Sequence, residues 1–283
     1  MNEQALKERL KTISHERNIH FNECWKKLIL ERFLVRLSHS AQMSKFIFKG
    51  GFLLGYMMQI GRETTDIDFL LTDITPSEDE IKLEIQQVIS TDLNDGFTFS
   101  YDQIELLEQP HMNCPGYRIS LRVVFGHMKD KIQIDVGVGD IVKAINRDFH
   151  LFQYKGKPLF ENEISLLVYP PETIFAEKLE TIISKGTANS RMKDYHDLFL
   201  LTQNPQLINP KTLKASLKST FNYRGTTFDL IKFDDQGLTS LQRLWTAHLK
   251  NLGNIAQELN MPKEIHELIT SINDVLYKIK QES

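Results

Sequence analysis

The stretch of residues 49–71, KGGFLLGYMMQIGRETTDIDFLL, constrains the fold of this chain more than any other. Near its end, Asp66 and Asp68 stand two residues apart in an otherwise apolar segment. That composition predicts a β-strand, and a strand sends residues i and i+2 to the same face. Two carboxylates on one face repel each other unless a cation lies between them. The pair therefore suits Mg²⁺, which binds one or two protein carboxylates and completes its shell with water and phosphate oxygens.

A Gly-Gly pair stands upstream of this strand. Gly50 and Gly51 follow the apolar strand candidate 46–48 and open a helical pattern over residues 52–60. Glycines at such a point let the backbone approach a phosphate at a helix N-terminus, where free amides and the dipole favour an anion. Together with the basic and polar link 62–65, these elements predict a compact site for phosphate and metal. The D-x-D pair alone has a second interpretation, two exposed carboxylates on an edge strand.

A third carboxylate occurs in a later strand candidate, residues 131–138. Its apolar residues alternate with polar ones, which projects Asp135 to the face opposite the buried side chains. A carboxylate in such a strand is costly unless it is paired or binds a metal. A salt bridge, or the exposed face of an edge strand, is the structural alternative. The short polar turn at 126–130 predicts antiparallel pairing with the strand candidate 117–125.

Length and composition fit a soluble protein with one large or two modest domains. The 283 residues are 41% hydrophobic and 25% charged, and no apolar run is long enough for a transmembrane helix. The polar N-terminus has no apolar signal segment, so we expect a cytoplasmic protein without membrane contact. Cys24 and Cys114 are isolated and indicate neither a disulfide framework nor a zinc site.

The formal net charge of −3 argues against a generally basic coat for nucleic acid, but the charge is uneven. Residues 1–60 hold ten Lys or Arg against five Glu. Four of these cations, Lys26, Lys27, Arg32 and Arg36, lie on a helix predicted over residues 22–40. They either solvate its outer face or contribute to a basic face that follows a phosphate backbone.

The rest of the pattern predicts a mixed α/β (α+β) part followed by a helical part. The N-terminal helices cover residues 1–18 and 22–40, and a further helix covers 75–91. Strand candidates beyond those above cover residues 97–107, 149–154 and 164–168. Tyr169-Pro170-Pro171 ends the last strand and begins a helix, which predicts domains at 1–169 and 170–283. Helix candidates in the second domain cover residues 171–185, 210–221, 237–251 and 262–280.

Gly-Gly, about a dozen residues and then R-x-T-x-D-I-D resemble the nucleotidyltransferase signature of the AbiEii/AbiGii-type toxins. These are the toxin halves of abortive-infection toxin–antitoxin pairs and are similar to the MenT-type toxins. The resemblance covers roughly residues 25–200. It implies a polymerase-beta-like nucleotidyltransferase core with a mixed sheet, Mg²⁺ (or Mn²⁺), and an NTP as substrate. It also implies tRNA or another RNA as acceptor, and a cognate antitoxin as partner.

The resemblance also assigns residues to roles. The implied metal ligands are Asp66, Asp68 and Asp135, the last followed by a D-x-G-x-G-D-like run through Gly137, Gly139 and Asp140. The implied triphosphate-binding residues are Lys49, Gly50, Gly51, Arg62 and Thr65. Thr64-Thr65 stands where some relatives use serine, and either hydroxyl can contact the triphosphate.

Two further motifs lie in the second half. Lys178, in A-E-K-L, resembles the family's nucleotide-contacting lysine, although a helical lysine commonly pairs with a nearby Glu instead. R-x-K-D-x-x-D-L matches the family's second signature, in which an acidic residue completes the active site. Asp194 is the first candidate for that role and Asp197 the second, with Arg191 and Lys193 as secondary candidates. The alternative is that these acids stabilise a helix N-terminus.

These features predict an enzyme that transfers a nucleoside monophosphate from an NTP to a hydroxyl, with a tRNA 3′ end as the acceptor implied by the family. Asp66, Asp68, Asp135, Lys178 and Asp194 are its candidate catalytic residues. Two alternatives remain open: nucleotidylation of a protein or small molecule, and a non-catalytic module that binds RNA or an antitoxin. The carboxylates argue against the module, because an inactive relative has no physical reason to keep three facing acids unpaired.

Overall fold

The computed structural model describes residues 1–107, 116–139 and 142–281, which form two compact units. Unit 1 comprises residues 1–56 and 63–169, and unit 2 comprises residues 57–62 and 170–283. The chain thus leaves unit 1 for the short segment 57–62 before it returns. The assignment of independent domains at 1–169 and 170–283 stays a prediction.

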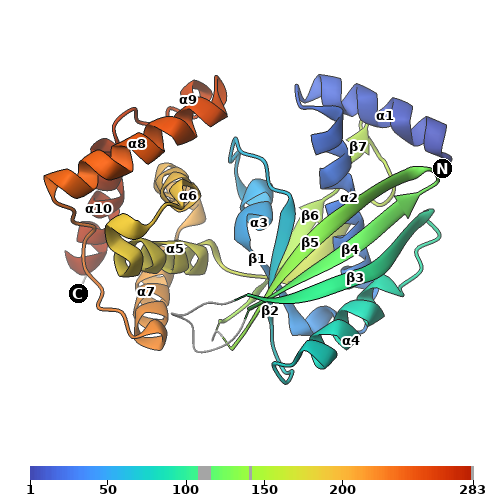
Figure 1. The fold of residues 1–283 in the computed structure, drawn as a ribbon, viewed down its shortest axis with the longest axis horizontal. Helices are drawn as coiled ribbons and strands as arrows, with labels where there is room; N and C mark the ends of the chain where they lie inside the picture. The colour runs from blue at the N-terminus through green and yellow to red at the C-terminus, as the bar shows by residue number, and fades with distance from the viewer. Residues whose placement is uncertain (108–115, 140–141, 282–283) are drawn as a thin grey trace. The chain divides into compact units, whose positions relative to one another are not determined.

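A seven-stranded mixed sheet forms the centre of unit 1 (Figure 1). The strand order is β3-β4-β5-β2-β1-β9-β6, in which β2 pairs with β5, and β1 with β9, in parallel. These strands are β1 (Phe46–Lys49), β2 (Asp66–Leu71), β3 (Phe97–Leu107), β4 (Gly116–Phe125), β5 (Met128–Val138), β6 (Ile145–His150) and β9 (Glu163–Val168). The predicted mixed α/β class and the antiparallel pairing of β4 with β5 are confirmed.

One face of this sheet is apolar and packs against helices. Ile67, Phe69 and Ile134 point to that face and are fully buried. Helix α2 (Phe21–His39) packs against β5, β9 and α4 (Glu78–Ile89), and the ring of its Phe33 lies 6.1 Å from the ring of Phe69. The N-terminal helix α1 (Glu3–Glu16) packs against α2, and α3 (Gly50–Met57) follows β1 directly. Because side chains alternate along a strand, the polar residues of β2, β4 and β5 share the other face.

Two of the four cations on α2 are buried and do not contribute to a basic surface. Arg32 and Arg36 are buried and both donate to Asp95, Arg32 through Nε at 2.8 Å and Arg36 through Nη2 at 2.9 Å. Arg32 also pairs with Glu161. Both sequence interpretations, a solvated outer face and an RNA-binding face, are therefore wrong for these two arginines. Burial of an arginine requires such carboxylate partners.

Strand β6 differs from the strand predicted at 149–154. It covers Ile145–His150, and its mostly exposed residues lack the apolar alternation that marks a half-buried strand. Gln153–Tyr154 instead forms β7, which pairs with β8 (Lys157–Pro158) across a two-residue turn.

Unit 2 is helical, as predicted. Its longer helices are α5 (Pro171–Lys185), α6 (Met192–Gln203), α7 (Pro210–Arg224), α8 (Asp235–Leu252) and α10 (Ile265–Gln281). The short helix α9 (Ile255–Glu258) lies between α8 and α10. The apolar stripes of these helices form its core, in which Trp245 and Leu268 are fully buried. In the part of the chain that the structure describes, no helix has the length and apolar character needed to cross a membrane.

Candidate active site

A row of charged side chains crosses the polar face of the sheet in unit 1. In the strand register, Lys49 of β1 stands opposite Asp68 of β2, and Asp68 stands opposite Asp135 of β5. Asp135 in turn stands opposite Arg118 of β4. Register partners on neighbouring strands share a face and lie about 5 Å apart. The row therefore brings two of the predicted carboxylates together between two cations.

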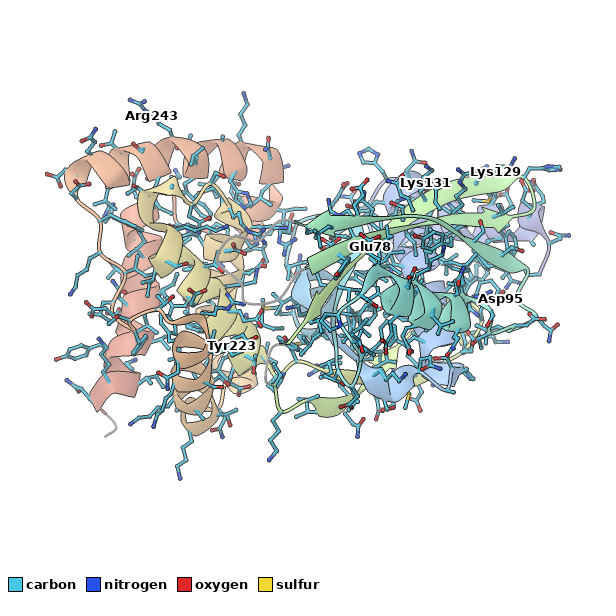
Figure 2. The ribbon with its side chains drawn as sticks, turned by 60° about the horizontal axis from the view of Figure 1, so that its bottom comes forward. Glu78, Asp95, Lys129, Lys131, Tyr223 and Arg243 are labelled. Carbon is cyan, nitrogen blue, oxygen red and sulfur yellow. The ribbon has the colours of Figure 1, made fainter. Side chains whose placement is uncertain are left out.

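Asp66 lies on the same face, two residues before Asp68. Its register partner in β5 is Gln133, and both aspartates are half-buried while Ile67 between them is fully buried. Further along β5, Lys129 and Lys131 extend from the strand in the same direction (Figure 2), as the alternation requires. The predicted set of Asp66, Asp68 and Asp135 thus shares one face of two adjacent, parallel strands.

The backbone of Gly50 lies in close contact with the side chain of Asp68. Gly50 has φ +79°, in the left-handed region that favours glycine, and a Cβ built on it would overlap the carboxylate of Asp68. The glycine turn therefore lets the backbone lie directly against the D-x-D strand. Gly51 follows in the first turn of α3, as predicted for a residue at a helix N-terminus.

Lys49 and the two threonines flank these elements. The Lys49 Nζ lies 5.0 Å from the centre of the Tyr169 ring and 3.9 Å from the position that a Cβ of Gly137 would occupy. The lysine therefore extends from β1 towards β5, over the polar face. Just before β2, Thr64 is buried and Thr65 is exposed.

Arg118 is a member of this group that the sequence reasoning missed. Its Nε donates to Asp135 Oδ1 at 2.8 Å and its Nη2 to Oδ2 at 2.7 Å, and these hydrogen bonds raise the pKa of Arg118. The salt bridge named above as the structural alternative for Asp135 is therefore present. A signal existed in the sequence, because a turn at Gly126-His127 places residue 118 opposite residue 135 in the hairpin.

The carboxylates fit a divalent cation by chemistry and by register, but not as a finished ligand set. Among the described residues, no group of three or more His, Cys, Asp or Glu side chains is arranged to hold a metal ion. Arg118 donates a hydrogen bond to each of the two oxygens of Asp135. Asp140, the last residue of the D-x-G-x-G-D-like run, lies outside the described residues.

Four of the remaining predicted residues form a buried ion-pair group within unit 2, namely Arg62, Lys178, Asp194 and Asp197, and the exposed Arg191 pairs with one of them. The Lys178 Nζ lies 2.8 Å from Asp194 Oδ1 and 2.8 Å from Asp197 Oδ2. Arg62, on segment 57–62, donates to both oxygens of Asp197 at 2.9 and 2.7 Å. Arg191 donates to Asp194 at 2.9 Å. Lys178 is therefore not paired with a glutamate, and both aspartates of the second signature surround it.

Mutual stabilisation of charge holds this group ionised. Burial alone would raise the pKa of Asp197, but Lys178 and Arg62 outweigh it and hold that pKa below its ordinary range. Burial alone would lower the pKa of Lys178, but Asp197 and Asp194 outweigh it and raise that pKa. Lys193, which could have paired with Asp197 one helical turn away, has an exposed side chain.

His196 links α6 to the same segment. Its Nε2 lies 2.8 Å from the carbonyl oxygen of Ile60, so Nε2 donates, and its Nδ1 lies 3.0 Å from Nε2 of His248. Burial lowers the pKa of His196 to about 4, which keeps the ring neutral, so Nδ1 accepts a hydrogen bond from His248. The His248 ring stacks on Trp245 with 5.2 Å between ring centres.

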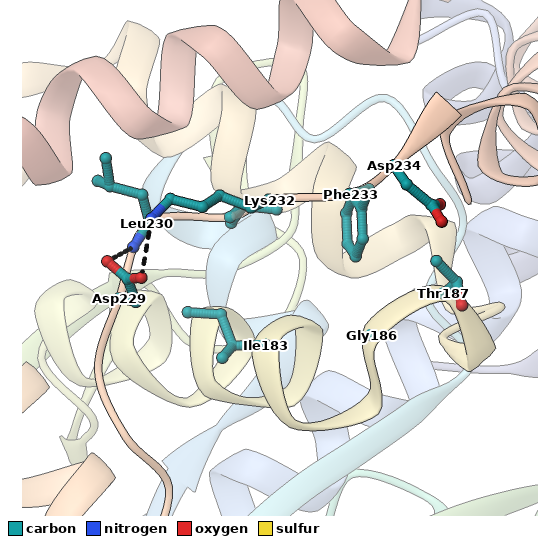
Figure 3. A pocket seen from close by; sticks show the side chains of 9 residues that line it. Ile183, Gly186, Thr187, Asp229, Leu230, Lys232, Phe233 and Asp234 are labelled. Atoms are coloured by element: carbon teal, nitrogen blue, oxygen red, sulfur yellow. Dashed lines mark hydrogen bonds and ion pairs between the residues drawn. The ribbon is translucent and has the colours of Figure 1, made fainter. Parts of the chain in front are cut away.

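A pocket of about 470 Å³ lies elsewhere in unit 2 (Figure 3). It is lined by the end of α5, the turn after it and the extended segment 229–234. None of the predicted site residues line it.

Comparisons with known proteins agree with the sequence motifs. Residues 32–263 match the family described as nucleotidyl transferase AbiEii toxins of type IV toxin–antitoxin systems. No protein with a curated description matches the sequence. Two crystal structures are similar to the chain. One is a protein of H. pylori provisionally named a nucleotidyltransferase, with 14% identity, a TM-score of 0.45, and coverage of 100% of this chain and 97% of that one.

The other is JHP933 from Helicobacter pylori, with 13% identity, a TM-score of 0.47, and coverage of 90% of this chain and 92% of that one. Scores at this level carry no argument about the site. The family match shows the family of the chain, and it reaches beyond the resemblance seen in the sequence to include helices of unit 2 up to residue 263. The family match spans most of the chain, from α2 past the carboxylates of unit 1 and the ion-pair group of unit 2. This protein therefore belongs to the AbiEii family of nucleotidyltransferase toxins.

Proposed function

We propose that this nucleotidyltransferase transfers a nucleoside monophosphate from an NTP to the 3′-terminal hydroxyl of a tRNA, with Mg²⁺ as its cation. The hydroxyl oxygen forms a bond to the α-phosphorus as the bond to the bridging oxygen breaks. Pyrophosphate leaves, and the hydroxyl proton passes to solvent. A tRNA extended in this way cannot be charged with an amino acid at its 3′ end, which accounts for toxicity.

The observation that carries the proposal is the strand register that sets Asp68 beside Asp135, with Asp66 on the same face. These three carboxylates would hold Mg²⁺, with Mn²⁺ as a substitute. A divalent cation at such a site supplies neutralisation of the charge on the phosphate oxygens. Arg118 holds Asp135 in place through two hydrogen bonds, and the Gly50 turn keeps the Asp68 carboxylate against the start of α3.

The triphosphate is the proposed ligand of the residues around the glycine turn. The amides at the start of α3, at Gly50 and Gly51, favour an anion, and Lys49 adds a positive charge on the same face. The exposed hydroxyl of Thr65 stands one residue before β2, where it can donate to a phosphate oxygen.

Lys178 stays a predicted phosphate ligand. Its 2.8 Å contact supports Asp194 as its positioning residue. The bidentate pair with Asp197 supports a structural role for Arg62 in unit 2 rather than a triphosphate contact.

Incubation with each α-labelled NTP, Mg²⁺ and total tRNA tests the proposal. We expect label on tRNA with the wild type, and at least about a hundredfold less with Asp66→Asn or Asp68→Asn, because each removes a charge needed to hold the cation. Asp102→Asn is the matched control. Asp102 is a carboxylate of β3 held by Arg122 and Lys131, outside the proposed site, so its loss should leave labelling intact.

The acceptor is tested in the same assay. Periodate oxidation of the terminal ribose of tRNA should abolish labelling if the 3′ end is the acceptor. Label on protein alone would replace tRNA by a protein acceptor. Equal labelling by wild type and Asp66→Asn would refute the assignment of the carboxylates.

A further inference from the structure

Helix α7 stands out in charge from the rest of the chain. Its fifteen residues, PKTLKASLKSTFNYR, include three lysines and one arginine but no Asp or Glu, whereas the whole chain has a net charge of −3. An acid-free basic helix in an otherwise acidic protein is a local source of positive potential.

The inner side of α7 is occupied by the core of unit 2. Leu213, Leu217 and Phe221 are buried, and α7 packs against α5 beside it (Figure 1). Arg224 also faces inward, because its Nη1 donates to Glu180 of α5 at 2.8 Å. The positive charge on the outer side of α7 therefore comes from the lysines.

Lys211, Lys214 and Lys218 are all exposed. At about 100° per residue they fall within an arc of about 60°, and they span about 10 Å along the helix axis. The other exposed positions of α7 are the first residue, Pro210, and positions with small or polar side chains: Thr212, Ala215, Ser219 and Asn222. The three lysines thus form a stripe, called the α7 stripe below, with hydroxyl and amide groups beside it.

The composition of this face distinguishes between two classes of partner. Protein interfaces are enriched in aromatic residues and Met and depleted in Lys and Ser. No large apolar side chain is exposed on α7, and those that the described part of the chain does expose lie on other elements. Contacts to the phosphates and sugars of nucleic acids come from Lys, Ser, Thr and Asn, which are the residues present here.

We propose that the α7 stripe binds the phosphate backbone of the acceptor RNA. The inference rests on the proposed function for the choice of RNA, and it gives unit 2 a role in substrate binding rather than in chemistry. The contact reads charge and not sequence, so it would hold any tRNA with similar affinity.

Neutralisation of the stripe provides the test. The triple variant K211Q/K214Q/K218Q removes three charges and keeps helix propensity, because Gln and Lys are similar helix formers. The matched control is R243Q/K250Q/K263Q, which removes three charges from exposed positions of unit 2 outside α7; Arg243 points away from α8 in Figure 2. Both variants change the net charge equally.

Binding of total tRNA is measured between about 50 and 200 mM salt. Each lost phosphate contact lowers the slope of log K against log salt by about 0.7 to 0.9. We expect the stripe variant to lose about 2 to 3 from this slope and at least about tenfold in affinity at the low-salt end, while the control keeps the wild-type slope. In labelling assays the stripe variant should raise the KM for tRNA and leave kcat unchanged.

Three results would overturn the inference: a wild-type slope in the stripe variant, an equal loss in the control, or displacement of tRNA by poly-glutamate at equal charge concentration, which would assign the stripe to an acidic protein. Its failure is separable from failure of the proposed function. Labelling of tRNA by a stripe variant with unchanged binding would keep the enzyme and discard the stripe. Loss of tRNA binding in the stripe variant, together with no labelling of tRNA by the wild type, would keep the stripe as an RNA contact and discard the proposed nucleotidyl transfer.

Discussion

Asp135 shows how one residue can satisfy two interpretations of the same pattern. Its place in the strand register beside Asp68 suits a metal ligand, while both of its oxygens accept hydrogen bonds from Arg118. The guanidinium supplies the positive charge that a cation would otherwise bring, because like carboxylates this close repel. Arg118 and a divalent cation should therefore compete for Asp135.

Replacement of Arg118 by Met tests this competition. We expect Arg118→Met to bind Mn²⁺ about fivefold more tightly than the wild type, since a half-exposed ion pair is worth about 1 kcal/mol. Mn²⁺ titration by paramagnetic resonance measures the affinity without turnover. Arg122→Met, on the same strand but paired with Asp102, is the control and should bind as the wild type does. Weaker Mn²⁺ binding by Arg118→Met would show instead that the arginine orients Asp135 for the metal.

Gly50 gives a second prediction at this scale. Gly50→Ala places a methyl group where Asp68 has its carboxylate and also strains a backbone at φ +79°. Gly156→Ala has a similar strain, φ +71°, with open space around the new methyl. Both variants should lose about 1 to 3 kcal/mol of unfolding free energy, and only Gly50→Ala should lose nucleotidyl transfer. Thermal unfolding and the labelling assay together separate the two effects; transfer at the wild-type rate in Gly50→Ala would show that Asp68 has room to move.

The residues that sequence reasoning could place are those with a local signal. Asp66, Asp68 and Gly50 stand in one short stretch, and their geometry follows from strand alternation and glycine conformation alone. Arg62 lies in the same stretch, but its partner Asp197 is 135 residues away, and no local pattern predicts that contact. The triphosphate contact of Arg62 stays a prediction, and the ion pair with Asp197 is a contact that the sequence did not reveal.

At the scale of elements, the sequence predicted what apolar periodicity marks. The antiparallel hairpin of β4 and β5 was predicted because its strands alternate regularly around a short turn. Strand β6 was misplaced because its exposed residues show no alternation. Helix α2 was predicted, but the burial of Arg32 was not, because that depends on Asp95 and Glu161 in distant segments.

Helix α6 leads to a prediction about pH. The pKa of His196 is about 4 in the folded chain because burial disfavours its charged form, against about 6.5 in an unfolded chain. Between these values the unfolded chain binds a proton that the folded chain does not, so stability falls as the pH falls from 6.5 to 4. The loss is about 3 kcal/mol. Above pH 6.5 His196 contributes no slope.

Urea unfolding followed by Trp245 fluorescence measures this slope in unit 2. Trp25→Phe leaves Trp245 as the one tryptophan, and it stacks on His248. In that background His196→Gln should flatten the dependence between pH 6.5 and 4, while His266→Gln, at an exposed position of α10, should not. The pKa of Asp197 is held low, so its own contribution is lost only at more acid pH. An unchanged slope in His196→Gln would assign the effect to other groups.

At the scale of the whole molecule, family membership rests on more of the chain than the motifs cover. The resemblance in the sequence reached about residue 200, while the family match continues to residue 263. The helices beyond α6 show only apolar stripes, which any helical core requires, so no chemistry marks them in the sequence.

Ligand binding by the intact chain should be visible in its thermal stability. An NTP with Mg²⁺ at about a hundred times its Kd adds about 2.7 kcal/mol to the unfolding free energy, which corresponds to a rise in Tm of about 5 °C for a chain of this length. Differential scanning calorimetry measures the shift. Asp66→Asn/Asp68→Asn should show none, and Asp102→Asn should shift as the wild type does. A full shift in the double variant would place the nucleotide elsewhere.

Segment 57–62 connects the helix of the glycine turn to the aspartate strand, yet it belongs to unit 2. Ile60 and Arg62 hold it to α6, and Gly61 is packed so closely against Ile255 and Leu259 that a methyl group there would overlap them. These six residues are thus a covalent connection between the two proposed catalytic elements, α3 with its glycine turn and β2. An antitoxin that displaced this segment from unit 2, or a protease that cleaved it, would loosen both the glycine turn and the aspartate strand. Neither would need to contact a catalytic side chain.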